Sequence, residues 1–165
     1  MDITCATAIS NIIKNGHEVG LHFDCSFYNI SNEEELINKL HFEKDILEGV
    51  FGLQVSSFSF HNPTEDILKY NKDQYAGMFN TYGLGFKKLR YCSDSNGYWR
   101  HKSIKDALLE DDSLPIQILT HPEWWNDSVM SPKERVWKCI DDNTEKVKDW
   151  YNQELISYNR ENIDW

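Results

Sequence analysis

Three histidines each stand within or directly after a short apolar segment typical of a β-strand. The segments are residues 18–24 with His22, residues 55–60 with His61, and residues 115–120 with His121. Side chains that form sites in α/β sheets and barrels gather at the carboxyl ends of the strands. Imidazole binds divalent metals and exchanges protons near neutral pH. The pattern therefore predicts that these histidines contribute to one metal-centred hydrolytic site.

Asp24 adds a carboxylate next to the first histidine. It lies two positions after His22, and side chains two apart on a strand share a face. Both groups could bind a metal, or Asp24 could orient the imidazole from behind. The structural alternative is a buried histidine near a loop aspartate. His61, held between an apolar strand and Pro63, is either a further ligand or a histidine bonded to a loop carbonyl.

His121 and Asp94 form a second candidate pair. Trp124 and Trp125 follow His121 closely, and aromatic side chains that exclude water suit a general acid or base. A structural turn with both tryptophans in the core is the alternative. Asp94 follows a predicted strand at residues 89–92 and could orient His121, although its Ser-Asp-Ser-Asn-Gly context also suits an Asx turn.

Helical periodicity and capping residues predict helices that alternate with the strands. The predicted helices are residues 3–15, Glu33 to Gly49 or Gly52, 64–70, 103–109 and 131–158, and a further strand is 78–82. Residues 24–31 are expected to form a loop. This alternation predicts an α/β fold with a largely parallel sheet. We expect a single domain over residues 1–165, closed by the C-terminal helix 131–158.

The two longest predicted helices each have an apolar side that should face the core. These sides comprise Leu36, Ile37, Leu40, Ile46, Leu47 and Val50 in the first, and Val136, Ile140, Val147, Trp150, Tyr151 and Leu155 in the second.

Composition limits the classes of partner and the compartment. A net charge of -10 argues against binding to nucleic acid or to an anionic membrane surface. The sequence has no apolar run of about 20 residues, so no membrane span is expected. The four cysteines are widely spaced and no secretory signal is evident, which favours reduced thiols in the cytoplasm. Cys25 or Cys92 beside a histidine remains an alternative nucleophile.

At these residues the chain resembles a known family. Residues 16–22, Gly-His-Glu-Val-Gly-Leu-His, resemble the G-H-E-[IV]-G-x-H segment of the polysaccharide deacetylases, which have the carbohydrate esterase family four fold. Residues 119–121 are similar to the family's late L-x-H motif. Residues 58–63 and 94–100 stand where the family has an Arg-Pro motif and an Asp and Trp motif. The resemblance covers residues 5–140, and is strongest to a divergent branch found in bacterial surface-polysaccharide gene clusters.

The resemblance implies a distorted (β/α) barrel and a divalent metal, often zinc, in an enzyme that removes acetyl groups from a sugar. The metal would activate water and polarise the acetyl carbonyl, and a histidine would protonate the leaving amine. His22 matches a metal ligand, His121 the catalytic acid, and Asp94 its orienting partner. His61 is assigned as a ligand from its position. The predicted substrate-binding residues are Trp99, Arg100, Trp124 and Asn62.

The chain also departs from the family pattern. Ser26 stands where the family has a second metal-binding histidine, so Asp24 or His61 would take its place. The family's opening strand, with its pair of aspartates, should precede Gly16 by more residues than are present. We therefore expect an incomplete barrel with an exposed sheet edge that a second copy could cover. The alternative function is a catalytically inactive domain that binds a glycan or a partner protein.

Overall fold

The chain forms two compact units. The computed structural model describes residues 3–99, 102–110 and 115–163, and the units are residues 1–89 (unit 1) and residues 90–165 (unit 2). Each unit has its own sheet and is described by itself. The single domain and the distorted barrel remain predictions.

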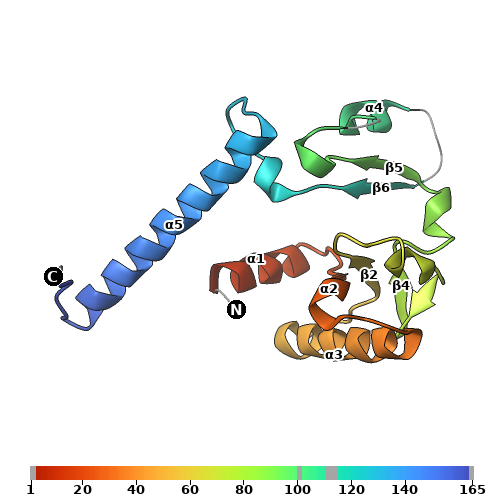
Figure 1. Ribbon diagram of the computed structural model, residues 1–165, viewed down its shortest axis with the longest axis horizontal. Coiled ribbons are helices and arrows are strands. Elements are labelled where there is room, and N and C mark those ends of the chain that lie inside the picture. The colour runs from red at the N-terminus through yellow and green to blue at the C-terminus, as the bar shows by residue number, and fades with distance from the viewer. Residues whose placement is uncertain (1–2, 100–101, 111–114, 164–165) are drawn as a thin grey trace. The chain divides into compact units, whose positions relative to one another are not determined.

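Unit 1 is built on a four-stranded sheet with the order β1-β2-β4-β3. β1, β2 and β4 are parallel, and β3 is antiparallel to β4. The elements of unit 1, most of them labelled in Figure 1, are α1 (Ile3–Lys14), β1 (Leu21–Phe23), α2 (Cys25–Tyr28), α3 (Glu33–Phe51), β2 (Ser57–Phe60), η1 (Ile67–Lys69), β3 (Gln74–Tyr75), β4 (Met78–Asn80) and η2 (Phe86–Lys88).

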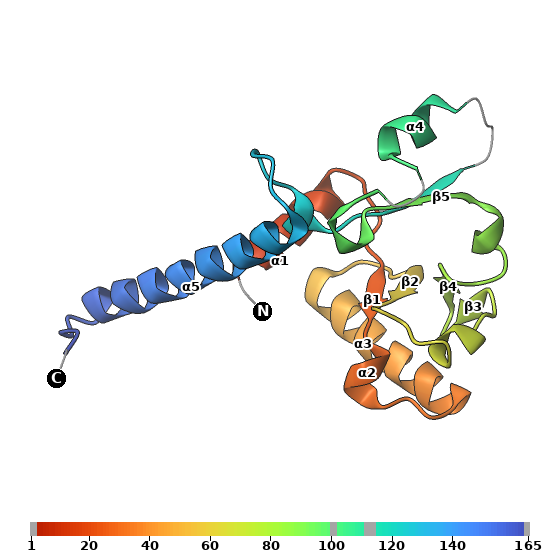
Figure 2. The same cartoon turned by 45° about the horizontal axis from the view of Figure 1, so that its top comes forward.

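The core of unit 1 lies between α3 and one face of this sheet. Period-two alternation places Phe23, Phe58 and Met78 on that face, all fully buried. Leu36 and Leu40 of α3 are also fully buried in the same cluster. Figure 2 shows α3 running along the sheet. The polar side chains at the alternate positions of these strands therefore lie on the opposite face of the sheet.

Asn80 is a fully buried polar residue at the end of β4. Its Nδ2 group donates 3.0 Å hydrogen bonds to the carbonyl oxygens of Tyr70 and Lys72. Its Oδ1 atom accepts a 3.0 Å hydrogen bond from the backbone N–H of Tyr82. The amide thus satisfies three backbone groups of the neighbouring loops, as burial requires.

Local capping explains where the helices of unit 1 begin and end. The side chain of Asn32 accepts a hydrogen bond from the backbone N–H of Glu35 and caps α3, which ends at Gly52 with φ 64°. The predicted start is confirmed, and Gly52 rather than Gly49 is the C-cap. Ile46 and Val50 are exposed, so their predicted burial is wrong. Only one side of a helix can pack against a flat sheet, so an apolar residue away from that side stays exposed.

Two elements of unit 1, besides the single 3₁₀ turn η2, were not predicted. Residues 24–31 were expected to form a loop, but they contain the four-residue helix α2, which Asp24 caps by accepting from the backbone N–H of Ser26. The short strand β3 is the other. Both elements are too short for a hydrophobic pattern to repeat within them, so periodicity cannot identify them.

Unit 2 has a two-stranded parallel sheet, in which β5 pairs with β6. The guanidinium of Arg90 donates a 2.9 Å hydrogen bond from Nη1 to the carbonyl oxygen of Ala107, and this bond joins β5 to α4. The elements of unit 2 are β5 (Arg90–Ser93), η3 (Ser95–Gly97), α4 (Ile104–Leu109), β6 (Ile116–Leu119), η4 (Pro122–Trp124) and α5 (Pro132–Ser157).

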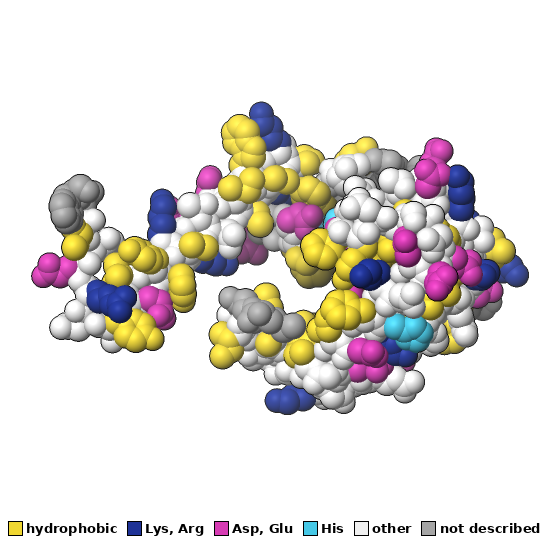
Figure 3. Space-filling view, turned by 60° about the horizontal axis from the view of Figure 1, so that its bottom comes forward, with side chains coloured by type: hydrophobic (Ala, Val, Ile, Leu, Met, Phe, Trp, Pro, Cys, Tyr) yellow, Lys and Arg dark blue, Asp and Glu magenta, His cyan; other side chains and the backbone are white. Residues whose placement is uncertain are grey.

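The long helix α5 begins as the sequence predicts, with a capping box made by Ser131 and Glu134 and with Pro132 in its first turn. Its predicted inner side is wrong, because no residue of α5 is buried. Trp150 and Ile140 are 63% and 57% exposed. Figure 3 shows hydrophobic side chains along this helix. Within the described residues, no helix is long and apolar enough to cross a membrane.

Candidate functional site

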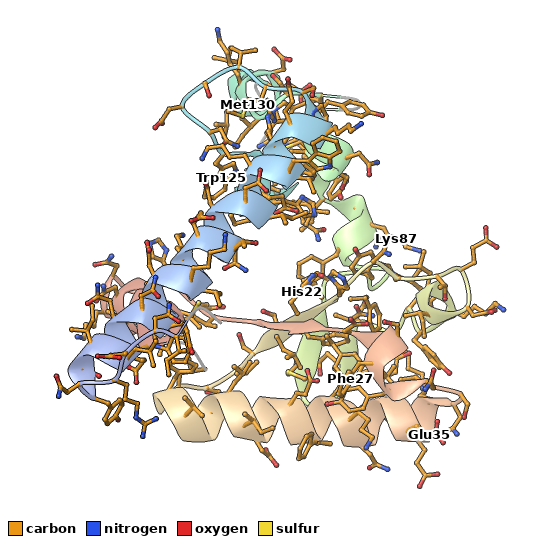
Figure 4. The ribbon with its side chains drawn as sticks, turned by 60° about the vertical axis from the view of Figure 1, so that its left-hand side comes forward. His22, Phe27, Glu35, Lys87, Trp125 and Met130 are labelled. Carbon is orange, nitrogen blue, oxygen red and sulfur yellow. The ribbon has the colours of Figure 1, made fainter. Side chains whose placement is uncertain are left out.

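His22 and His61 lie side by side on the exposed face of the unit 1 sheet. The Nε2 atom of His22 is 3.2 Å from the Nδ1 atom of His61, and the two rings meet edge to face. His22 is the middle residue of β1, between buried neighbours. In Figure 4 it lies on the side of β1 away from α3. His61 follows β2 directly, and its backbone N–H donates a 2.8 Å hydrogen bond to the carbonyl oxygen of Phe23.

The other ring nitrogen of His22 is fixed by Ser59. The Nδ1 atom of His22 lies 2.7 Å from the Oγ atom of Ser59, its register partner on β2. Metal-binding histidines typically make such a second hydrogen bond, which fixes the tautomer and the orientation of the ring. With Nδ1 held by Ser59, the Nε2 atom of His22 is the one directed at His61.

The spacing of the two imidazole nitrogens fits a shared metal ion. Two nitrogens bound to one tetrahedral zinc at about 2.0–2.1 Å lie about 3.3 Å apart. The observed Nε2 to Nδ1 separation of His22 and His61 is 3.2 Å. The same 3.2 Å is also the length of a direct N–H···N hydrogen bond between the two rings, so the separation is compatible with two zinc ligands but does not require a metal.

Asp24, the third predicted ligand, is engaged elsewhere. Its Oδ1 atom accepts hydrogen bonds from the Oγ atom of Ser26 at 2.6 Å and from the backbone N–H of Ser26 at 2.9 Å. These bonds lower the pKa of the Asp24 carboxyl, and the nearby His61 adds a smaller effect in the same direction. Among the described residues, no three His, Cys, Asp or Glu side chains are grouped as a metal site.

In unit 2, Asp94 and His121 form the predicted pair. The Oδ1 atom of Asp94 is 2.7 Å from the Nδ1 atom of His121, and Oδ2 accepts a 3.2 Å hydrogen bond from the backbone N–H of His121. The two residues come together because parallel β5 and β6 pair Ser93 with Leu119, just before them. The Asp94 side chain is 7% exposed and that of His121 is 34% exposed.

The geometry of this pair specifies what His121 can do. When Asp94 is a carboxylate, which only accepts hydrogen bonds, the hydrogen of this contact is on the Nδ1 atom of His121. The Nε2 atom is then left to receive a proton from a reacting group, or to return one when the ring is protonated. Because Asp94 is buried and holds both the ring and the backbone of His121, the imidazole is positioned for acid–base chemistry.

The predicted substrate-binding residues fall in different places. Asn62 is exposed beside His61 and has a φ of 40°. Trp99 is half-buried in the loop that follows η3, and Arg100 lies outside the described residues. Trp124 is half-buried, and its ring centroid is 6.5 Å from that of His121.

The alternative cysteine nucleophiles are poorly suited to that role. Cys25 and Cys92 are both buried. Burial, with the Asp24 and Glu43 carboxylates nearby, raises the pKa of Cys25 to about 11. Burial also raises the pKa of Cys92. A thiol with a raised pKa supplies little thiolate at neutral pH, so the structure does not favour thiol-dependent catalysis.

Two residues of the histidine site were missed by the sequence reasoning. Ser59 was noted only as a residue of its strand, and strand register alone could have paired it with His22. Gly20 lies on the same face, and a Cβ atom there would lie 2.8 Å from the Oγ atom of Ser57. The glycine in the Gly-Leu-His segment allows β1 to approach β2 closely. Glu18 accepts a 3.3 Å hydrogen bond from the Oγ atom of Ser56, in the segment before β2.

No family model, curated protein or solved structure matches the chain.

Proposed function

We propose that the protein is a metal-dependent hydrolase of the polysaccharide deacetylase type, which removes acetyl groups from a sugar or a surface-polysaccharide intermediate in a bacterial cytoplasm. The observation that carries the proposal is the pair of imidazole nitrogens of His22 and His61, 3.2 Å apart. The motif resemblance of residues 16–22 supports the choice of reaction.

His22 and His61 would hold the metal, which is zinc in this proposal. A bound divalent ion supplies Lewis-acid polarisation of a carbonyl oxygen and activates water. Ser59 would keep the His22 ring in its ligating orientation through the 2.7 Å contact at Nδ1. Asp24 is the candidate for a third ligand, but its carboxylate would first have to leave the N-cap of α2.

In unit 2, His121 is the candidate proton carrier for a reaction of this type. Its Nε2 atom would donate to the nitrogen or oxygen of the leaving sugar, while Asp94 stabilises the charged ring through Nδ1. A buried carboxylate behind a half-exposed histidine favours proton transfer over a purely structural turn. The half-buried rings of Trp99 and Trp124 are the proposed sugar contacts.

The test combines metal binding with product release. The purified protein should bind one zinc ion in a competition titration with a chromophoric chelator. His22→Ala and His61→Ala should each lose this binding, whereas His41→Ala, on the exposed surface of α3, should retain it. Acetate release from an acetylated amino-sugar oligosaccharide should depend on zinc and on His121.

Other outcomes would separate the alternatives. Absence of zinc binding by the unmodified protein would refute the proposed metal-dependent function. Zinc or oligosaccharide binding without acetate release would favour the alternative, a catalytically inactive domain that binds a glycan or a partner protein. Self-association is a further part of the proposal, because β1 ends the strand order of its sheet and an edge strand can pair with a second copy. Light scattering of the purified protein tests it.

A further inference from the structure

Unit 2 contains a cavity of ≈ 440 Å³ between α5 and the segment around η4. This volume lies within the range of small-molecule sites. The argument rests on six of its lining residues, which are Trp125, Asn126, Arg135, Lys138, Asn143 and Lys146. Figure 4 shows Trp125 beside α5. None of these residues has a role in the proposed hydrolysis.

The lining is richer in basic groups than the chain as a whole. Arg135, Lys138 and Lys146 all line the cavity, with Glu123 and Asp142 as its acidic residues. Lys138 is paired with Asp142, so the remaining charged residues of the lining are Arg135, Lys146 and the exposed Glu123. In a chain with a net charge of -10, a cavity with this balance selects for a negatively charged group.

Arg135 provides a second, independent observation. Its Nε atom is buried and has no hydrogen-bond partner among the described residues. Its Nη1 atom lies 3.5 Å from the carbonyl oxygen of Gly97, a long contact. A buried donor without an acceptor is costly. Arg135 lines the cavity, so a rotation of its guanidinium would let a carboxylate or phosphate oxygen there satisfy this donor. Guanidinium groups bind such anions with paired, charge-assisted hydrogen bonds.

The remaining lining residues indicate a sugar as the body of the ligand. Trp125 is 66% exposed, and a flat aromatic surface of this kind packs against the C–H face of a sugar ring. The side-chain amides of Asn126 and Asn143 both donate and accept hydrogen bonds, as sugar hydroxyl groups require. The volume of the cavity suits one or two sugar rings.

We propose that this cavity binds an acidic sugar, one that carries a carboxylate or a phosphate group. Arg135 and Lys146 bind the anionic group, Trp125 packs on the ring, and the two asparagines bind hydroxyl groups. The choice of a sugar rests on the proposed function, and it makes the cavity a subsite for an acidic residue of the glycan. The anion specificity rests on the cavity alone.

Cys139 allows a direct test, because it is exposed and lines the cavity. Its rate of alkylation by iodoacetamide, followed by peptide mass spectrometry, should fall about tenfold when a glucuronic-acid oligosaccharide or glucose 1-phosphate saturates the site. The exposed Cys5, in unit 1, is the internal control and should keep its rate. Comparing the two acidic probes distinguishes a carboxylate from a phosphate as the preferred anion.

Variants and neutral probes decide the outcome. Arg135→Gln and Lys146→Gln should each weaken protection about tenfold, a loss of one charge-assisted contact. Lys148→Gln, on the same helix but paired with Glu145 outside the cavity, should not. Should Arg135→Gln fail to fold, Lys146→Gln and Trp125→Ala still test the site.

Three results would overturn the inference. Equal protection by a neutral oligosaccharide would show that the cations do not select the ligand. Equal protection by inorganic phosphate at the same concentration would remove the sugar from the proposal. Unchanged Cys139 alkylation with every probe would refute the site as a whole. None of these results depends on zinc binding or acetate release, so the inference and the proposed hydrolysis can fail separately.

Discussion

His22 and Ser59 are opposite each other in the sheet, and their side chains are in contact. They are register partners in the parallel pairing of β1 with β2, and the Nδ1 atom of His22 lies 2.7 Å from the Oγ atom of Ser59. The sheet itself therefore sets the orientation of the imidazole. A rigid backbone element positions a side chain more precisely than a loop does.

Ser59→Ala should lower zinc affinity without unfolding unit 1. Loss of the hydrogen bond behind a metal ligand typically reduces affinity about 10–100-fold. Chelator competition measures this change. Ser57→Ala is the matched control, because Ser57 is on the same strand and the same face but lies against Gly20 rather than His22. Equal effects of the two variants would contradict the role given to Ser59.

Gly20→Ala should destabilise the protein. A Cβ atom at position 20 would lie 2.8 Å from Oγ and 3.0 Å from the carbonyl oxygen of Ser57, so the Ser57 hydroxyl has to rotate away and the carbonyl has to shift by a few tenths of an ångström. Overpacking of this kind costs about 1–3 kcal/mol, measurable by urea unfolding. Gly49→Ala is the control, because a Cβ there meets nothing within 4 Å. Position 49 lies inside α3, where alanine should instead stabilise by about 0.5–1 kcal/mol.

Asp94→Asn should alter the tautomer of His121. An amide can donate a hydrogen bond to Nδ1, which moves the ring hydrogen to Nε2 and removes the lone pair that receives a proton. The ring ¹⁵N shifts of His121 report this exchange directly. If the protein is a hydrolase, turnover should fall about 10²–10⁴-fold. Asp106→Asn is the control, since Asp106 bonds to Ser103 in α4, and an unchanged His121 spectrum in Asp94→Asn would refute the assignment.

The Asp24 cap should make stability depend on pH in the acid range. The Ser26 hydroxyl, and then its backbone N–H, hold the pKa of Asp24 below its ordinary value of 3.8. The folded state therefore favours the ionised form. The resulting stabilisation is fully present above the unfolded pKa and is lost as the pH falls through the lowered, folded pKa.

Comparison with Asp24→Asn isolates this effect, because asparagine caps helices about as well as aspartate but does not titrate. The difference in unfolding free energy between the two proteins should be constant above about pH 5 and shrink below it. Ser26→Ala should raise the pKa of Asp24 toward its ordinary value. A pH-independent difference would show that the cap does not depend on the charge.

The sequence predicted elements whose signals are local. Ser131, Pro132 and Glu134 start α5 because the capping box is made within one turn. Gly16, with φ 82°, follows the first helix as a residue that tolerates the left-handed region. Most strands were located within a few residues for the same reason. Asp94 and His121 were paired correctly because adjacent parallel strands deliver their next residues to one edge.

What the sequence missed depends on packing between segments. Trp150 and Val147 lie on an apolar side of α5, and periodicity alone could not show that this side is exposed. Asp24 was assigned to a metal because two-residue spacing on a strand puts it beside His22. The chain instead leaves the strand at Asp24 and starts α2 there. The contact between Gly20 and Ser57 depends on the distance between strands, which no local pattern encodes.

Asn80 occupies a buried position whose three hydrogen bonds we expect only asparagine to satisfy. Its buried amide supplies two donors to carbonyl oxygens and one acceptor to an N–H group. Aspartate would place a second acceptor against those carbonyls, and leucine would supply neither kind of group. Glutamine has the right groups on a side chain that is one methylene too long for a fully buried site. In a saturation screen for folded protein, position 80 should therefore recover only the amino acid it already has.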